Sequence, residues 1–540
     1  IHPASGTRSI SPTTVMMMSA SFSRQLLIST VLVLLVPLYV YFRRSSSSIR
    51  SKNPSVLPRN WPIIYMFPSF MANVHKLHDY LAVVLAGSDH NFRAHSPPGM
   101  GIRFFITCDP ENARHIFTTN YTNFPKGAEF AAIFDIMGGA LFTMDGEPCR
   151  RPRANLQRVL SSPRMVSRLA ACCRDKVENG LLPLLAHMES TCTPIEVQEL
   201  TSRLMFDLTS TMVFGVDSSL LSSDLPPMDA PAAMDTVMEV GFFRHVVPAA
   251  CWKAMRRLNI GPERKLGKAH VVLRRFVAEM IQRRKTKGKH VGRNDEEQES
   301  SVEDILSSLI NDPDYADDNL LCATLISYML AGRDTVGTTL PWIFYNLAQN
   351  PDVVSNIRNE LSPIIASRKV VIEGADAMGS MVIFEPEETK PLLYLKAVLY
   401  ETLRLYPPAA IERKTVKTDD IMPSGHEVKA GDTILIAVHS MGRMEGLWGK
   451  DCLDYNPHRW LLQDGKKLRY VPSHKFLAFN SGPRMCPGKE IAVMQMKTIV
   501  AALVWNFDME LVEGHRIQPK MSCILQMKNG FMVNLKKREI

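Results

Sequence analysis

The sequence predicts a mainly α-helical protein with small β-sheets, preceded by one membrane-spanning helix. Apolar residues recur at helical spacing over residues 165–285, Val302–Gln349 and Pro351–Ile365. An almost entirely apolar stretch, Gln25–Phe42, comes before all of them. Runs that suit β-strands are short: Ile102–Thr107, Thr433–Val438 and Phe531–Leu535.

The N-terminal region is expected to anchor the chain in a membrane. Residues 1–24 form an N-terminal segment, of which the polar residues 1–15 precede the first methionine and are expected to be read-through of untranslated sequence. As a helix, Gln25–Phe42 would span roughly 27 Å, enough for a thin bilayer. A cleaved signal peptide is the alternative, but the length of the run and its aromatic end favour a retained anchor. Arg43 and Arg44 follow at once and predict a cytoplasmic body.

The rest of the chain is expected to form a linker and one large domain. Residues 43–62 contain a serine run and several prolines, which suits a linker and hinge. Residues 63–540 are long enough for a large catalytic domain. The net charge of +9 is spread along the chain, which argues against a nucleic-acid-binding stripe and suits an anionic membrane surface or an acidic partner. The 10 cysteines form no CxxC pairs and are expected to be reduced.

The most specific signal is Phe479–Gly488, a loop that carries one cysteine to the start of a helix. Apolar residues at helical spacing follow Gly488, so Cys486 lies just before a helix N-terminus. Free N–H groups and the helix dipole favour a thiolate there. Gly482 permits a tight turn, and Arg484 places a cation two residues from the sulfur. Such a thiolate can bind a metal ion as a single ligand; a buried, inert cysteine is the alternative.

A second group of candidate residues lies in a long helical pattern. Ala331 shares a helix face with Asp334 or Thr335. The small residues Ala331 and Gly332 would leave room for a diatomic ligand, and Asp334 and Thr335 could pass protons to it. The alternative is an ordinary polar patch in which the threonine bonds to its own helix. Pro341 follows within two turns and predicts a kink.

A third motif, Glu401 and Arg404, places opposite charges three residues apart on a helix. An exposed pair of this kind contributes little to stability. The leucines around it indicate burial instead, and a buried pair needs a further partner. Arg459 is the candidate for that partner.

These motifs resemble those of the cytochrome P450 family, over roughly residues 57–540. The resemblance implies the cytochrome P450 fold with haem b, whose iron would take Cys486 as its axial ligand in a loop that includes Phe479 and Gly482. It also implies oxygen activation at Ala331–Thr335 and a structural core of Glu401, Arg404 and Arg459. Three arginines are expected at the haem carboxylates: Arg153, Arg413 and Arg484.

The chain departs from the family pattern near two of these motifs. Cys149 stands where the family usually has tryptophan, and Pro148 and Pro152 flank it. Pro152 is expected to disturb the first turn of the helix that carries Arg153. His458 stands where glutamate is usual. These departures leave open a degenerate P450 that binds haem or ligand without turnover.

Several runs, such as Asn123–Gly127 and Met441–Gly449, resemble plant P450s that include mid-chain alkane hydroxylases and noroxomaritidine synthases, within the clan of fatty-acid omega-hydroxylases. The resemblance implies an enzyme, a monooxygenase that uses O2 to hydroxylate an alkane or a fatty acyl chain. Oxidative phenol coupling in alkaloid synthesis is the alternative. The segments expected to contact the substrate are largely apolar: 130–142, 237–247, 322–330, 409–411 and 522–525.

The chain carries no glycine-rich dinucleotide fingerprint, so electrons are expected from NADPH-cytochrome P450 reductase. Four cations near Cys486 in the sequence are expected to form a docking surface for it: Lys475, Arg484, Lys489 and Lys497. With the predicted anchor, this gives a single-pass protein of the endoplasmic reticulum membrane with a cytosolic catalytic domain.

Overall fold

The computed structural model describes residues 58, 66–95, 103–222, 224–291, 304–371 and 381–539. The chain divides into two compact units, residues 1–57 and residues 58–540. The predicted anchor Gln25–Phe42 and nearly all of the predicted linker lie outside the described residues. Within the described part of the chain, no helix is both long enough and apolar enough to cross a bilayer.

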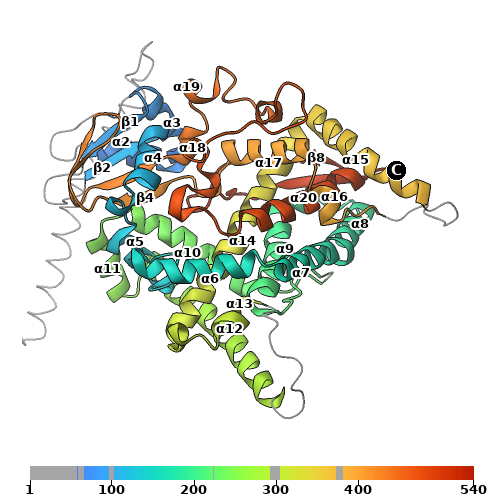
Figure 1. Ribbon diagram of the computed structural model, residues 1–540, viewed down its shortest axis with the longest axis horizontal. Coiled ribbons are helices and arrows are strands. Elements are labelled where there is room, and N and C mark those ends of the chain that lie inside the picture. Colours follow the sequence, from blue (N-terminus) through green and yellow to red (C-terminus); the bar gives the residue numbers. More distant parts are fainter. Residues whose placement is uncertain are drawn as a thin grey trace, which may run out of the picture. The chain divides into compact units, whose positions relative to one another are not determined.

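The second unit is mainly helical, as the sequence predicts (Figure 1). Its helices of eight or more residues are α3 (Leu77–Ala86), α6 (Arg150–Leu160), α7 (Pro163–Asp175), α8 (Leu182–Ser190), α9 (Val197–Phe214), α10 (Asp229–Val246), α11 (Ala249–Arg257), α12 (Gly261–Val291), α14 (Asp318–Gln349), α15 (Pro351–Val371), α17 (Leu393–Leu405) and α20 (Lys489–Asn506). The shorter α-helices are α2 (Phe67–Asn73), α4 (Pro110–Arg114), α5 (Gly127–Ile133), α13 (Ile305–Leu309), α16 (Pro386–Thr389), α18 (Val438–Met441) and α19 (Glu445–Trp448).

Three small sheets accompany the helices. The largest has the order β1-β2-β7-β4, in which β2 and β7 are parallel and the other pairs are antiparallel. A second sheet has the order β3-β9-β8, and β5 pairs with β6. All three predicted strands are present, with bounds that differ by a few residues. The strands are β1 (Asn91–His95), β2 (Arg103–Thr107), β3 (Ile195–Glu196), β4 (Glu412–Thr415), β5 (Asp420–Ile421), β6 (Glu427–Val428), β7 (Thr433–Ile436), β8 (Phe507–Leu511) and β9 (Met532–Lys537).

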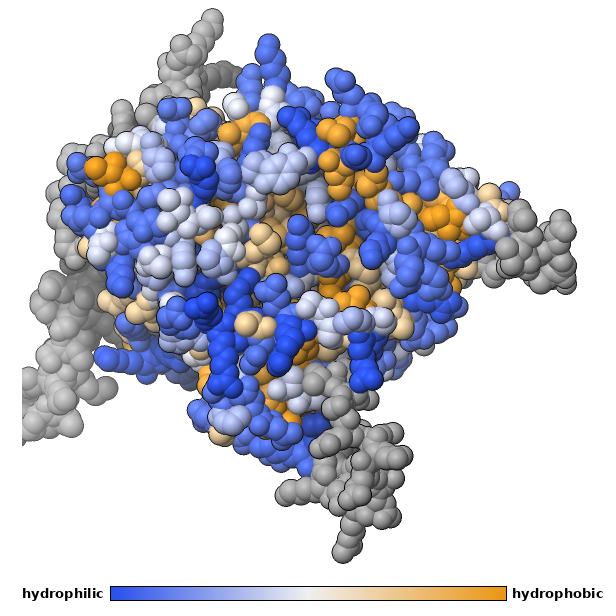
Figure 2. Space-filling view, viewed as in Figure 1, coloured by the Kyte–Doolittle hydropathy of each residue, from blue (hydrophilic) through white to orange (hydrophobic). Residues whose placement is uncertain are grey.

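The buried apolar residues form three clusters. One joins α8, α17 and α20 with the C-terminal half of α14, and a second joins α10 and α12 with its N-terminal half. The third lies on the four-stranded sheet together with α3. Helix α14 belongs to two of the three clusters, so its middle lies between them. The face drawn in Figure 2 is mostly hydrophilic, with hydrophobic atoms in small scattered groups.

Pro152 does not disturb its helix, contrary to the expectation from the sequence. Helix α6 runs without interruption from Arg150, which makes Pro152 its third residue. The first four N–H groups of a helix have no partner within it, so a proline there removes no hydrogen bond. Helix α14 contains Pro341 and continues to Gln349, and the kink expected at Pro341 stays a prediction. Helix α12 continues to Val291, beyond residue 285, where the helical spacing in the sequence ends.

Candidate active site

Cys486 lies where the sequence places it, three residues before α20 begins at Lys489. Its backbone N–H donates to the carbonyl of Phe479, 2.8 Å away, which closes the loop. Gly482 has φ +58°, and a Cβ built there would lie 2.2 Å from the Phe117 carbonyl oxygen. Only glycine allows both this backbone conformation and this close approach. The loop is therefore fixed against the Phe117 backbone.

The Cys486 side chain is exposed, yet protein surrounds it closely enough that burial raises the pKa of its thiol. The Gly488 N–H, Arg153 and Lys489 act in the opposite direction and favour the thiolate. In the absence of a metal ion, burial outweighs the helix-terminus effect that the sequence emphasised. Both properties fit a thiol at the edge of a ligand site, and a bound metal ion would deprotonate it.

Two of the predicted arginines lie beside the cysteine loop. Arg153, on α6, donates through Nη2 to the carbonyl of Met485. Arg484 donates to the carbonyl of Met144 and to Asp145 Oδ1, the latter at 3.1 Å. Segments more than 300 residues apart in the sequence thus bring two guanidinium groups next to Cys486.

The half-buried Lys126 and the buried Lys414 lie near this group, and the sequence analysis missed both. Burial lowers the pKa of Lys126 to about 7; the carboxylate of Glu412 acts against this, and the nearby cations Lys414 and Arg484 act with it. The Lys126 ammonium donates to the carbonyl of Phe142 at 2.8 Å. Lys414 is 3% exposed and lies over the Phe117 ring, with no ion pair or hydrogen bond for its ammonium among the described residues. Burial lowers the pKa of Lys414 as well. Buried cations without carboxylate partners favour a bound anion.

Arg413, the third predicted arginine, points elsewhere. It neighbours Lys414 on β4, and successive side chains of a strand point to opposite faces. Arg413 Nη2 donates to Glu129 on α5 and to Thr433 Oγ1, and its Nε has no hydrogen-bond partner. Lys414 thus lies near Arg484 and over the Phe117 ring, whereas the Arg413 side chain contacts Glu129 and Thr433, and the predicted role of Arg413 at a haem carboxylate stays a prediction. Proximity in sequence could not distinguish them, because they are adjacent.

The middle of α14 has an unusual pattern of exposure. Residues 321–330 are all buried, and so are Arg333 and Asp334, yet Ala331 between them is exposed. A small exposed residue within an otherwise buried stretch of helix fits a ligand site. Gly332 has a different role from the one predicted. A Cβ on it would lie 2.8 Å from Thr209 Cγ2, so the glycine allows α9 to pack closely against α14.

Asp334 and Thr335 both have partners within the protein. The Thr335 hydroxyl donates to the carbonyl of Ala331 at 2.9 Å, one turn earlier, which is the alternative that the sequence left open. Asp334 Oδ1 accepts from Arg333 at 2.8 Å, whereas Asp334 Oδ2 is buried without a partner. Burial raises the pKa of Asp334 to about 6, against the effect of Arg333. At neutral pH this carboxyl group is therefore close to its titration range.

The three charged residues of the predicted structural core meet. Arg404 donates to both Glu401 oxygens at 2.8 Å, and Arg459 donates to Glu401 Oε1 at 2.8 Å. The Trp460 indole N–H donates to Glu401 Oε2 at 2.9 Å. Glu401 and Arg404 have fully buried side chains, so removal of one partner would leave a buried charge. Asp451 supplies a second carboxylate to Arg459 at 2.8 Å.

The predicted substrate segments also come together in part. Residues of α5, α10, α14 and the C-terminal segment pack in one cluster that includes Phe134, Val237, Leu325 and Ile524. The Cys523 N–H donates to the carbonyl of Met238, which joins the C-terminal segment to α10. The turn 409–411 contributes to the other two clusters instead. The lining is apolar, as predicted.

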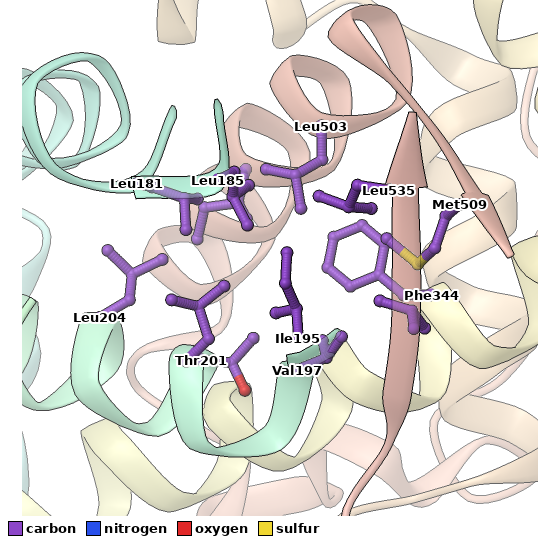
Figure 3. A pocket seen from close by; sticks show the side chains of 13 residues that line it. Leu181, Leu185, Ile195, Val197, Thr201, Leu204, Phe344, Leu503, Met509 and Leu535 are labelled. Atoms are coloured by element: carbon purple, nitrogen blue, oxygen red, sulfur yellow. The ribbon is translucent and has the colours of Figure 1, made fainter. Parts of the chain in front are cut away.

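A separate apolar pocket lies between α8, α9, α20 and the sheet of β8 and β9 (Figure 3). It is lined by 13 residues, among them Leu185, Phe344, Leu503 and Val533, and none carries a titratable side chain. Its volume of about 10 Å³ is roughly what one water molecule needs. It is a gap in core packing, with no room for a substrate.

One residue of the predicted docking surface, Lys497, is buried in the protein. Lys497 is 2% exposed, and its ammonium donates to the carbonyls of Thr389, Lys390 and Leu392 at 2.7 to 2.9 Å. Burial lowers the pKa of Lys497 to about 8. It lies two turns into α20, where the helix turns this position inward. A residue in this position cannot contact a protein partner.

Comparisons with known proteins agree with the motifs. The Cytochrome P450 family profile matches residues 57–535. Noroxomaritidine synthase 2 of Narcissus pseudonarcissus is 34% identical over 495 residues, which cover 91% of this chain and 94% of that protein. Alkane hydroxylase MAH1 of Arabidopsis thaliana is 32% identical, with coverage of 94% and 98%. Cytochrome P450 86B1 of the same plant is 34% identical, with coverage of 94% and 90%.

Proposed function

Because the chain belongs to the cytochrome P450 family, we propose that it is a haem-thiolate monooxygenase that hydroxylates a long-chain aliphatic substrate. That it is a P450 enzyme follows from the family profile and from relatives that cover nearly its whole length. The substrate and the site residues are our proposal. One observation carries it: an exposed cysteine, an exposed alanine in the middle of a buried helix, and the buried Lys414, which has no ion pair among the described residues, occur in one fold.

The residues present fit haem. Cys486 would bind the iron through its thiolate. Arg153, Arg484, Lys126 and Lys414 would meet the two haem carboxylates. Lys126 and Lys414 fit this role because burial lowers the pKa of each lysine by more than the nearby carboxylates Glu412 and Asp145 raise it, and a bound carboxylate would reverse this effect. When bound, haem supplies the activation of O2 and the oxidation of the substrate.

The chain's own residues position the substrate and manage protons. The apolar residues of α5, α10 and α14 would exclude water and hold an extended hydrocarbon. Ala331 would leave space for O2, and Asp334 would provide a proton from Oδ2. Thr335 would turn its hydroxyl from the Ala331 carbonyl toward the bound ligand. Electrons would come from NADPH-cytochrome P450 reductase, and Gln25–Phe42 would anchor the protein in the endoplasmic reticulum membrane.

The test is turnover of purified full-length protein with reductase and NADPH. Long-chain alkanes, fatty acids and a phenolic alkaloid precursor are supplied separately, and product, peroxide and NADPH are measured together. We expect hydroxylated alkyl products, and Cys486→Ala should lack both the thiolate-type CO spectrum and the activity. Coupling of the phenol rings without oxygen insertion, with no alkyl product, would overturn the proposal and favour the alkaloid branch. Absence of a CO spectrum in the wild type would indicate a degenerate protein.

A further inference from the structure

A buried network joins the middle of α14 to three other segments. Arg333, 3% exposed, donates from Nη1 to Asp235 Oδ1 of α10 at 2.6 Å and to Asp334 Oδ1 at 2.8 Å. Its Nη2 donates to Ser202 Oγ of α9. Gln526, from the C-terminal segment, donates to Asp235 Oδ1 at 3.0 Å. One guanidinium group is thus shared by two carboxylates.

The two carboxylates differ in their access to solvent. The Asp235 side chain is 29% exposed, whereas that of Asp334 is 2% exposed. Asp334 also has an oxygen, Oδ2, without a hydrogen-bond partner. A buried carboxylate oxygen without a donor is costly when the group is ionised and suits a group that carries a proton there.

Among the described residues, the charged groups on the elements packed against this network pair with other partners. On α9, Arg203 pairs with Glu199, and Asp207 pairs with Lys176. On α10, Glu239 pairs with Lys520. The groups facing Arg333 and Asp334 are therefore Ser202, Asp235 and Gln526, within the described part of the chain.

The charge balance depends on Asp235. If Asp334 were the only partner of Arg333, protonation of Asp334 would leave a buried guanidinium without a counterion, which is strongly unfavourable. We propose that Asp235 is a positioning residue that lets Asp334 gain and release a proton inside the protein, because Asp235 holds the Arg333 guanidinium while Asp334 is neutral. The role in oxygen chemistry rests on the proposed function, but the charge balance itself does not.

The proposed step transfers one proton to Asp334 and then from Asp334 to the active site. Asp334 takes a proton from a hydronium ion of the solvent: an O–H bond of the hydronium breaks, which leaves water, and an O–H bond forms at Oδ2. That bond breaks when Asp334 gives the proton to an acceptor in the active site, and Asp334 returns to a carboxylate that Arg333 holds. No electrons move, and Arg333 keeps its own protons throughout, because a guanidinium is not deprotonated in proteins. Asp235 contributes charge and position and carries no proton itself.

Infrared titration of the oxidised holoenzyme tests this directly, without substrate or reductase. The carbonyl stretch of a protonated carboxyl group identifies Asp334 as the band lost in Asp334→Asn. In the wild type we expect this band to disappear as the pH rises through about 6. In Asp235→Asn it should disappear about one pH unit lower or more, because Arg333 then acts on Asp334 alone.

Two further variants make the test specific. Asp235→Glu keeps a carboxylate and should restore a titration close to that of the wild type. Glu239→Gln removes a carboxylate one turn further along α10, away from Arg333, and should leave the band unchanged. The proposal is overturned if the Asp334 band disappears at the same pH in Asp235→Asn and in the wild type. It is also overturned if Glu239→Gln shifts that pH as much as Asp235→Asn does. If Asp235→Asn fails to bind haem, Asp235→Glu decides. The proposal is supported if the Asp334 band of Asp235→Glu disappears at the same pH as in the wild type, and it is contradicted if the band disappears at a lower pH.

Turnover then separates this inference from the proposed function. With any substrate that the enzyme accepts, Asp235→Asn should slow NADPH consumption several-fold, and Asp235→Glu should recover most of it. If no alkyl substrate is oxidised but the infrared shift is found, the substrate proposal fails and the charge-balance proposal stands. If alkyl substrates are oxidised but the Asp334 band of Asp235→Asn disappears at the wild-type pH, the substrate proposal stands and the charge-balance proposal fails.

Discussion

The side-chain hydroxyl of Thr201 donates a hydrogen bond of 3.0 Å to the backbone carbonyl of Gly337. This carbonyl would normally accept from the residue four positions later, but that residue is Pro341, which has no N–H. Thr201, on α9, thus supplies from another helix the donor that α14 lacks, and its side chain is buried. A proline that should interrupt the central helix is accommodated by a contact 136 residues away in the sequence.

Replacement of Thr201 by valine should destabilise the protein by about 1–3 kcal/mol, because the buried Gly337 carbonyl would lose its donor. In Pro341→Ala the new alanine supplies a backbone N–H for the Gly337 carbonyl. Thr201→Val should therefore lower the free energy of unfolding clearly less in the Pro341→Ala background than in the wild type. Denaturant unfolding of the two single variants and the double variant measures the difference. Equal costs of Thr201→Val in both backgrounds would contradict this account.

Lys126 should make the stability of the haem-free protein rise with pH. Its pKa is about 7 in the folded protein, whereas an unfolded lysine titrates near roughly 10.4. Between these values the unfolded chain binds more protons, so stability increases as the pH rises. Thermal midpoints from pH 7 to about 9 measure this slope, which should be smaller in Lys126→Met and in the haem-bound protein, where a carboxylate would keep the lysine charged.

Lys528→Met, which removes an exposed lysine, is the matched control and should keep the wild-type slope.

Lys414→Met should weaken the retention of haem during gel filtration. Arg413→Met should retain more haem than Lys414→Met does. If loss of Arg413 released haem more readily than loss of Lys414, the assignment of the two residues would be reversed.

Lys489 and Lys497 should behave differently, although both lie on α20. Lys489→Glu should raise the reductase concentration needed for half-maximal turnover, and the effect should be larger at low salt. Lys497→Met should destabilise the protein by about 2 kcal/mol or more, because it removes a charged donor from three buried carbonyls. Its reductase dependence should match that of the wild type.

Reductase titrations at two salt concentrations and thermal midpoints distinguish these effects. Lys536→Glu, at an exposed position of β9, controls for the change in net charge. An equal loss of reductase affinity in Lys489→Glu and Lys536→Glu would remove Lys489 from the docking surface.

The sequence alone identified the features that depend on local spacing. The loop around Cys486, the pair Glu401 and Arg404 one turn apart, and the mainly helical fold with short strands are all encoded by neighbouring residues. The family followed from the same motifs, because a cysteine between fixed glycine and arginine positions is rare by chance. Arg459 was also found, since a buried ion pair requires a further partner.

Only the tertiary structure decided which side chains share a site. It put Lys414 near Arg484 and the Phe117 ring, turned Lys497 inward, packed Gly332 against α9 and brought Asp235 to Arg333. Each of these outcomes depends on the direction of a side chain toward an element distant in sequence. Local periodicity fixes the secondary structure, but it leaves open which distant partner each side chain meets, and that partner determines burial and charge.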